Sequence, residues 1–239
     1  MKVYRVDQGS GEWYRLRAGR PTASNFHKII TPKGVPSAQA VKYIYRLVAE
    51  RLLNETMDDE LGFVQWIGRG KEQEPAACAT FEFLNEVPLE PGGFITSNDG
   101  RIGASPDRMV KGGREGVEVK CPAPWTQIQY LLDGPGDDYR PQVQGHLLCA
   151  DEFKAVHFWS WHPQMPPLHR VTLRDRGYQP LLASALNTFC DNLDRATERA
   201  RALGAYAVAR RMETPGERAY QAEEDIQLKF PDGGDLGDA

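Results

Sequence analysis

The chain has 239 residues, of which 41% are hydrophobic and 26% charged, and its net charge is −4. This composition excludes disordered, collagen-like and membrane-spanning proteins, and the length is ample for a domain with a substantial core. No apolar run is long enough to cross a bilayer and the N-terminus has no signal-peptide core, so we expect a soluble cytoplasmic protein.

The charge is unevenly distributed along the chain. Residues 205–239 hold eight acids and four bases, while residues 1–204 carry 25 charges of each sign. Residues 13–49 contain no acid but seven bases: Arg15, Arg17, Arg20, Lys28, Lys33, Lys42 and Arg46. Such a stretch fits either a phosphate-binding surface or a cationic face turned to solvent, and both interpretations remain open.

The N-terminal third is predicted to be helical. A short helix is expected over residues 13–18, and "RPTAS" breaks it. Between residues 39 and 54 the apolar positions recur at helical spacing, which predicts an amphipathic helix. Residues 69–86 predict another helix, in which Pro75 is compatible only with the first turns or with a kink.

The rest of the chain alternates between strands and helices. "GFITSND", "RIGASPD" and "GVEVKCP" predict adjacent antiparallel strands separated by turns. A helix is expected over "DDYRPQVQGHLLCA", a hairpin over "FKAVHFWSWHP" and "LHRVTLRD", and a final helix over residues 179–203. This order predicts one α/β (α+β) domain over residues 1–204, followed by an acidic, Gly-rich and partly disordered extension over residues 205–239.

One hairpin-sized segment, "GASPDRMVKGGREGVEVKCP", combines two acids with a lysine. Glu118 and Lys120 lie two apart on a strand and so share a face, opposite Val117 and Val119. If strand pairing brings Asp107 to Glu118, two carboxylates and the backbone carbonyl of Val119 provide the hard oxygen ligands that Mg²⁺ prefers. Lys120 would then orient a water molecule and help to deprotonate it. On its own, the pattern also fits a solvated turn with a surface ion pair.

Five motifs, which occur in a fixed order along the chain, together carry a resemblance to a known family. "WYRLRAGRPTAS", "GRGKEQE", "SPD", "EVKCP" and "QVQ" follow one another within residues 13–144. Together they resemble the lambda-exonuclease family of phage recombination nucleases, part of the PD-(D/E)xK superfamily that includes restriction endonucleases. The resemblance covers about residues 8–204. It implies a restriction-endonuclease-like core, with a central mixed β-sheet flanked by helices.

The resemblance also implies an active site. It identifies Asp107, Glu118 and the Val119 carbonyl as Mg²⁺ ligands. Lys120 is implied to be the catalytic lysine, Glu74 the further acid and Gln142 the active-site glutamine. Glu74 would help to hold a second ion or its water. The chain departs from the family pattern by placing Pro75 directly after Glu74.

A second set of residues is implied to bind the DNA end. Arg17, Ser24 and Ser105 match residues that bind the 5′-terminal phosphate, and a guanidinium suits phosphate because it binds bidentately. The two serines also fit a helix cap and a turn. Ile67 matches an apolar residue that separates the terminal base pair, although an isolated Ile also fits a core position.

The activity that the resemblance implies is a Mg²⁺-dependent 5′→3′ exonuclease. It would use two ions per site, with Mn²⁺ as a substitute, and degrade one strand of linear double-stranded DNA to mononucleotides, leaving a 3′ overhang. The resemblance further implies a homotrimeric ring around DNA, a single-strand annealing protein as partner, and phage-type recombination in the cytoplasm of a bacterial host.

Two other classes of function remain open. One is another nuclease of the superfamily, either a sequence-specific endonuclease or an iron–sulfur enzyme. The other is a DNA-binding or annealing module without catalysis. The cysteines speak against a zinc or iron–sulfur cluster because they occur singly, at Cys78, Cys121, Cys149 and Cys190. His146, His157, His162 and His169 have no metal-ligand spacing, and the sequence assigns them no chemistry.

Overall fold

The structure, a computed structural model, describes residues 1–57, 65–112 and 114–203, with backbone only for residues 65–69 and 71. The predicted extension over residues 205–239 therefore lies outside the described residues. Within the described part of the chain, no helix combines the length and the apolar character that crossing a membrane requires.

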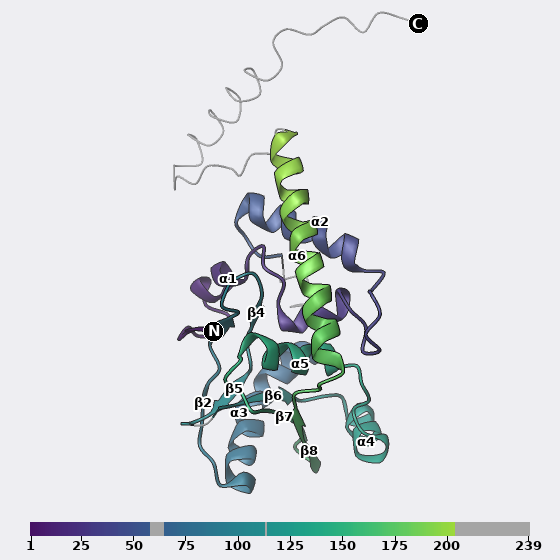
Figure 1. Cartoon of the computed structure of the whole chain (residues 1–239). Helices are drawn as coiled ribbons and strands as arrows, with labels where there is room; N and C mark the ends of the chain where they lie inside the picture. Colours follow the sequence, from purple (N-terminus) through teal and green to yellow (C-terminus); the bar gives the residue numbers. More distant parts are fainter. Residues whose placement is uncertain (58–64, 113, 204–239) are drawn as a thin grey trace, which may run out of the picture. The chain divides into compact units, whose positions relative to one another are not determined.

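A five-stranded mixed sheet forms the centre of the fold, in the order β2-β5-β6-β7-β8 (Figure 1). Its strands are β2 (Leu89–Pro91), β5 (Arg108–Val110), β6 (Glu115–Lys120), β7 (Ala155–His162) and β8 (Met165–Leu173). β6 and β7 run parallel, and the other neighbouring pairs are antiparallel. Parallel pairing needs a crossover, which two helices between β6 and β7 supply. The predicted mixed α/β fold is confirmed.

Helices cover both faces of this sheet (Figure 1). The helices of the described chain are α1 (Gly11–Arg17), the 3-10 helix η1 (Ala23–Lys28), α2 (Ala40–Leu53), α3 (Gln65–Asn85), α4 (Pro124–Asp133), α5 (Arg140–Cys149) and α6 (Tyr178–Ala202). α3 packs on one face, where Phe81 joins Val117 and Val119 in a buried cluster. α5 lies on the opposite face, toward which strand alternation directs Glu118 and Lys120.

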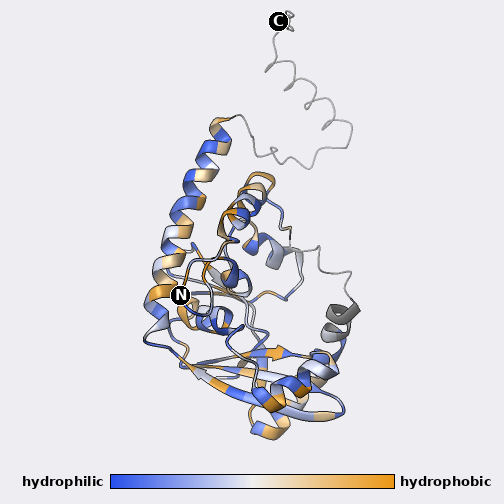
Figure 2. Ribbon diagram, turned by 90° about the vertical axis from the view of Figure 1, so that its right-hand side faces the viewer, coloured by the Kyte–Doolittle hydropathy of each residue, from blue (hydrophilic) through white to orange (hydrophobic). Residues whose placement is uncertain are grey.

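Two further units complete the described chain. A second, antiparallel sheet contains β1 (Lys2–Tyr4), β3 (Phe94–Thr96) and β4 (Gly103–Ala104) in the order β1-β3-β4. α2 packs against α6, where the Tyr43 and Phe189 rings stack with their centroids 5.4 Å apart. Leu182, Leu186 and Leu193, which recur at helical spacing along α6, are buried in the same hydrophobic cluster as these two rings. Figure 2 shows the alternation of hydrophobic and hydrophilic residues along α6.

The arrangement of the strands differs from the prediction around residues 103–110. "RMV", predicted as part of a turn, is β5, and Arg108 lies opposite Val117 of β6. "RIGASPD" contributes only β4, which belongs to the other sheet, so the prediction of three adjacent strands is wrong here. The chain changes sheets at Pro106, which has no N–H to donate to a ladder.

Two helices also differ from expectation. α3 begins at Gln65, so Pro75 lies in its interior, and placing this proline in the first turns is wrong. Burial of Ala77 and Phe81 against the sheet offsets the cost of an interior proline, about 3 kcal/mol. α4 was not predicted, although Pro124 occupies its first turn, where proline is favoured.

Candidate active site

Asp107, Glu118 and Lys120 meet where β5 begins and β6 ends. The Lys120 ammonium lies 2.5 Å from Oε1 of Glu118. The N–H of Val119 donates to Oδ2 of Asp107 at 2.7 Å, which places that carboxylate beside β6. β5–β6 pairing causes this meeting, because Asp107 immediately precedes the strand that pairs with β6. The structure thus brings the three motif residues together.

Two side chains from α5 complete the surroundings of Glu118. Gln142, expected in the site, donates its Nε2 hydrogen to Oε1 at 2.6 Å. His146, to which the sequence assigned no role, places Nε2 2.9 Å from Oε2. Residues four apart share a helix face, so the position of Gln142 on a predicted helix was the signal that could have found His146.

Burial and mutual charge control the protonation of the three motif residues. Burial alone would raise the pKa of Glu118, but the Lys120 charge and the hydrogen bond from His146 lower it to about 2. Burial and the Glu118 charge raise the pKa of Asp107 well above its usual range. Although burial opposes it, the charges of Glu118 and Asp107 raise the pKa of Lys120. Lys120 is therefore an ammonium group, which donates hydrogen bonds and stabilises negative charge more readily than it removes a proton.

Glu74 lies beside this centre but contacts a different group. Its Oε1 is 2.9 Å from Nη1 of Arg108, the residue that follows Asp107. Among the described residues, no three His, Cys, Asp or Glu side chains converge as they would around a metal. In this arrangement Glu74 lies near Asp107 but pairs with Arg108.

The donor set at Asp107 and Glu118 fits a hard divalent cation. Asp107 and Glu118 share Lys120 as a positive neighbour, and their mutual repulsion disfavours ionisation of Asp107. A divalent ion between them would stabilise both ionised carboxylates, and carboxylate and carbonyl oxygens are the ligands that Mg²⁺ prefers.

A cavity of 450 Å³ opens beside Asp107 and Glu74. Its lining also includes Arg108, Gln8 and Trp13. Its volume lies within the range of small-ligand sites, about 300 to 1,000 Å³.

Arg17 and Ser105 are linked through Trp13 at this cavity. The Arg17 guanidinium lies 4.2 Å from the centroid of the Trp13 ring. The indole Nε1 of Trp13 donates to Oγ of Ser105 at 2.9 Å, and Gln8 donates to the same oxygen at 3.1 Å. Two of the three residues expected at the 5′-phosphate therefore belong to one contact network.

Ser24 and Ile67 are less closely connected to this network. Ser24 is exposed in η1, and its Oγ lies 3.4 Å from Oγ1 of Thr22. Thr22 forms a β-bridge with Gly103, two residues before Ser105, so the Ser24 segment runs beside the Ser105 segment. Ile67 lies in α3, but its side chain is outside the described residues.

The chain also matches a known protein family. Residues 12–152, more than half of the chain, match the YqaJ-like viral recombinase domain. The chain belongs to this family. A comparison with curated proteins gives no match. The predicted relationship to phage-type exonucleases is confirmed, and membership of a nuclease family implies a metal cofactor.

Solved structures of exonucleases share the fold of this YqaJ-like chain. The alkaline exonuclease LHK-Exo from Laribacter hongkongensis is 25% identical, with a TM-score of 0.73 over 82% of this chain and 98% of LHK-Exo. LHK-Exo has also been solved in complex with dAMP. A phage-related exonuclease from Haemophilus somnus 129PT is 14% identical, with a TM-score of 0.60 over 75% of this chain and 96% of its own, and shares the fold.

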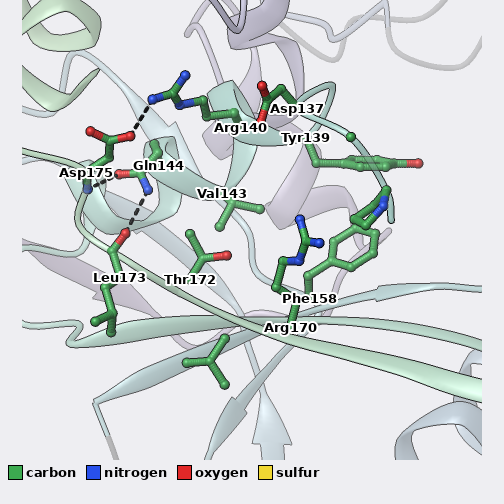
Figure 3. Close-up of a pocket in the computed structure, with 13 residues that line it drawn as sticks. Asp137, Tyr139, Arg140, Val143, Gln144, Phe158, Arg170, Thr172, Leu173 and Asp175 are labelled. Carbon is green, nitrogen blue, oxygen red and sulfur yellow. Dashed lines mark hydrogen bonds and ion pairs between the residues drawn. The ribbon is translucent and has the colours of Figure 1, made fainter. Parts of the chain in front are cut away.

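A larger cavity, of 570 Å³, lies on the same face of the sheet as Glu118 (Figure 3). Phe158 lies opposite both Glu118 and Arg170 in the strand register, so all three side chains share that face. Arg140 and Asp175 both line this cavity, and they form an ion pair at 2.5 Å. None of the expected metal ligands lines it, which separates it from the candidate metal site.

The cysteines form no cluster. All four are free thiols, and Cys78, Cys149 and Cys190 are buried. Burial raises the pKa of Cys190 to about 11 and that of Cys149 further still. Among the described residues the thiols join no group of three metal-ligating side chains, and thiols held in the protonated form are unsuited to metal binding in this arrangement.

Proposed function

We propose that this YqaJ-like protein is a Mg²⁺-dependent 5′→3′ exonuclease that degrades one strand of double-stranded DNA from its end. The observation that carries the proposal is the meeting of Asp107, Glu118 and Lys120, of which Asp107 lines a cavity of 450 Å³. The complex of the related LHK-Exo with dAMP supports a nucleotide as the occupant of such a cavity.

Asp107, Glu118 and the Val119 carbonyl would hold the ion, and Glu74 would hold a second one or its water after release from Arg108. When bound, Mg²⁺ polarises the scissile phosphate and activates water. Lys120 orients the attacking water and stabilises the negative charge that develops on the phosphate. Gln142 fixes the orientation of the Glu118 carboxylate through its hydrogen bond to Oε1.

Recognition of the DNA end would fall to the residues around Trp13. Arg17 is held against the Trp13 ring, and Ser105 accepts a hydrogen bond from the indole N–H. A guanidinium and a hydroxyl are suitable donors for a terminal phosphate. We assign this phosphate to Arg17, Ser105 and Ser24, and strand separation to Ile67.

The assembly belongs to the same proposal. A homotrimeric ring that encircles the duplex would make digestion processive without tight binding. A single-strand annealing protein would then take up the 3′-tailed product for phage-type recombination. Mn²⁺ should replace Mg²⁺ because it binds to the same oxygen ligands.

The test is digestion of linear duplex DNA by the wild-type protein and by Lys120→Ala. Loss of a group that stabilises charge in the transition state should lower the rate by roughly 10²- to 10³-fold. Activity of the wild type should disappear with EDTA and return with Mg²⁺.

The fold must be unchanged for this result to count, so circular dichroism accompanies each assay. Lys154→Ala, a change at an exposed lysine just before β7, is the control and should keep full activity. Wild-type cleavage in EDTA, or full activity of Lys120→Ala, would sink the proposed mechanism. Iron or visible absorbance in the purified protein would favour the iron–sulfur alternative.

A further inference from the structure

The two oxygens of Glu118 are held in different ways. Oε1 accepts from Lys120 at 2.5 Å and from Gln142 at 2.6 Å, two side chains that are partly accessible. Oε2 accepts from Nε2 of His146 at 2.9 Å, where both side chains are buried. Oε2 therefore lies on the buried side of the carboxylate, and the contacts of Oε1 lie nearer to solvent.

Among the described residues, the side chain of His146 makes one hydrogen bond, to Oε2 of Glu118. Its side chain is 1% exposed, and among the described residues its Nδ1 has no hydrogen-bond partner. An ionised carboxylate only accepts hydrogen bonds, so Nε2 of His146 donates to Glu118. A buried imidazole that makes one polar contact has little reason to be polar except for that contact.

We propose that His146 is a positioning residue that holds Oε2 of Glu118 by a hydrogen bond, which opposes binding of one ion by both oxygens of this carboxylate and so favours Mg²⁺ over Ca²⁺. This inference rests on the proposed metal site. Mg²⁺ demands a small octahedral set of ligands, to which a carboxylate contributes one oxygen readily. Ca²⁺ accepts six to eight ligands and often takes both oxygens of a carboxylate. A donor fixed on Oε2 opposes the second mode.

A pair of variants separates donation from packing. His146→Leu fills the space without a donor, and His146→Gln places an amide N–H near the position of Nε2. We expect His146→Leu to lower the ratio of Mg²⁺ to Ca²⁺ affinity by roughly tenfold or more, the usual effect of losing an outer ligand contact. His146→Gln should restore most of the wild-type ratio.

Isothermal titration of the full-length protein with Mg²⁺ and with Ca²⁺, in the absence of DNA, measures this ratio without depending on activity. His162→Leu is the matched control, because His162 is also buried, at the end of β7, where its Nδ1 accepts from the N–H of Gln164. That variant should keep the wild-type ratio even if it melts at a lower temperature. If His146→Leu does not fold, His146→Gln still tests the inference, because it must fold and keep the ratio.

The outcomes distinguish the inference from the proposed function. An unchanged ratio in folded His146→Leu would overturn the role of His146 while leaving the nuclease proposal intact. A ratio in His146→Gln as low as that in His146→Leu would overturn it as well. Absence of Mg²⁺ binding by the wild type would overturn both proposals.

Discussion

Arg17 stands out among the seven bases of residues 13–49 because it alone is buried. Its guanidinium lies against Trp13, at 8% exposure, beside the cavity that contains Asp107. Burial of this side chain argues against a cationic face turned to solvent at this position, and a guanidinium suits a phosphate because it binds bidentately. The composition of the segment alone did not separate these two interpretations.

For this reason Arg17→Ala should lose most of the preference for 5′-phosphorylated ends. A charge-assisted hydrogen bond contributes about 1.5 to 3 kcal/mol, so the ratio of the rates on phosphorylated and unphosphorylated duplex should fall roughly 10- to 100-fold. Arg15→Ala is the matched control on the same helix, because Arg15 is exposed. Equal losses on both substrates would show that Arg17 is structural.

Only some contacts of the candidate site could be predicted from the sequence. Asp107, Glu118 and Lys120 were predictable because strand alternation and one turn determine their meeting. Helical spacing places His146 on the same face as Gln142, but its contact with Glu118 depends on how α5 lies across the sheet, and no local pattern contains that orientation. The pairing of Glu74 with Arg108 likewise depends on the packing of α3 beside β5.

At the scale of elements, α5 is held between the sheet and η1 by a close approach. A Cβ atom on Gly145 would lie 2.5 Å from the ring of Phe26, which is fully buried and cannot move aside. Gly145 therefore allows α5, which carries Gln142 and His146, to lie at its observed depth.

Gly145→Ala should therefore destabilise the protein. Alanine favours a helix by about 1 kcal/mol over glycine, but overpacking a core costs about 1 to 3 kcal/mol and should prevail when the clash is this close. Urea denaturation measures the change. Gly11→Ala, at the start of α1 with open space around its Cβ, should change the free energy of unfolding by less than about 0.5 kcal/mol. Equal stability of Gly145→Ala and the wild type would contradict the close packing.

The long periodic helices were the elements most accessible to prediction. α2 and α6 have apolar stripes that a window of sequence reveals, and their bounds agree with expectation within one residue at each end. β5 was missed because its three residues follow a proline and carry no alternation of their own. Its strand character comes from pairing with β6, which is a non-local contact.

At the scale of the whole molecule, an exonuclease that starts at an end must distinguish linear from closed DNA. The wild-type protein should therefore degrade linear duplex and leave covalently closed circles intact. Gel analysis of both substrates in Mg²⁺ checks this, and linearising the circle should restore digestion. Cleavage of closed circles at defined positions would favour the sequence-specific endonuclease.

The proposed ring makes a separate prediction about size. In solution the protein should have three times the mass of the 26.8 kDa chain, as measured by light scattering. A monomer that remains processive would contradict the topological explanation of processivity. The motifs imply a ring only through resemblance, because subunit contacts depend on surfaces that no short motif encodes.

The central position of β6 has a consequence for amide hydrogen exchange. β5 and β7 flank this strand, and α3 and α5 cover its two faces. Backbone N–H groups in such a place exchange with solvent only when the whole domain opens. We expect the Val119 amide, which donates to Asp107, to be among the slowest to exchange, and Mg²⁺ to slow it further. The strand that carries the proposed metal-binding carboxylate would then be among the most rigid parts of the described chain, and any motion that admits DNA must occur elsewhere.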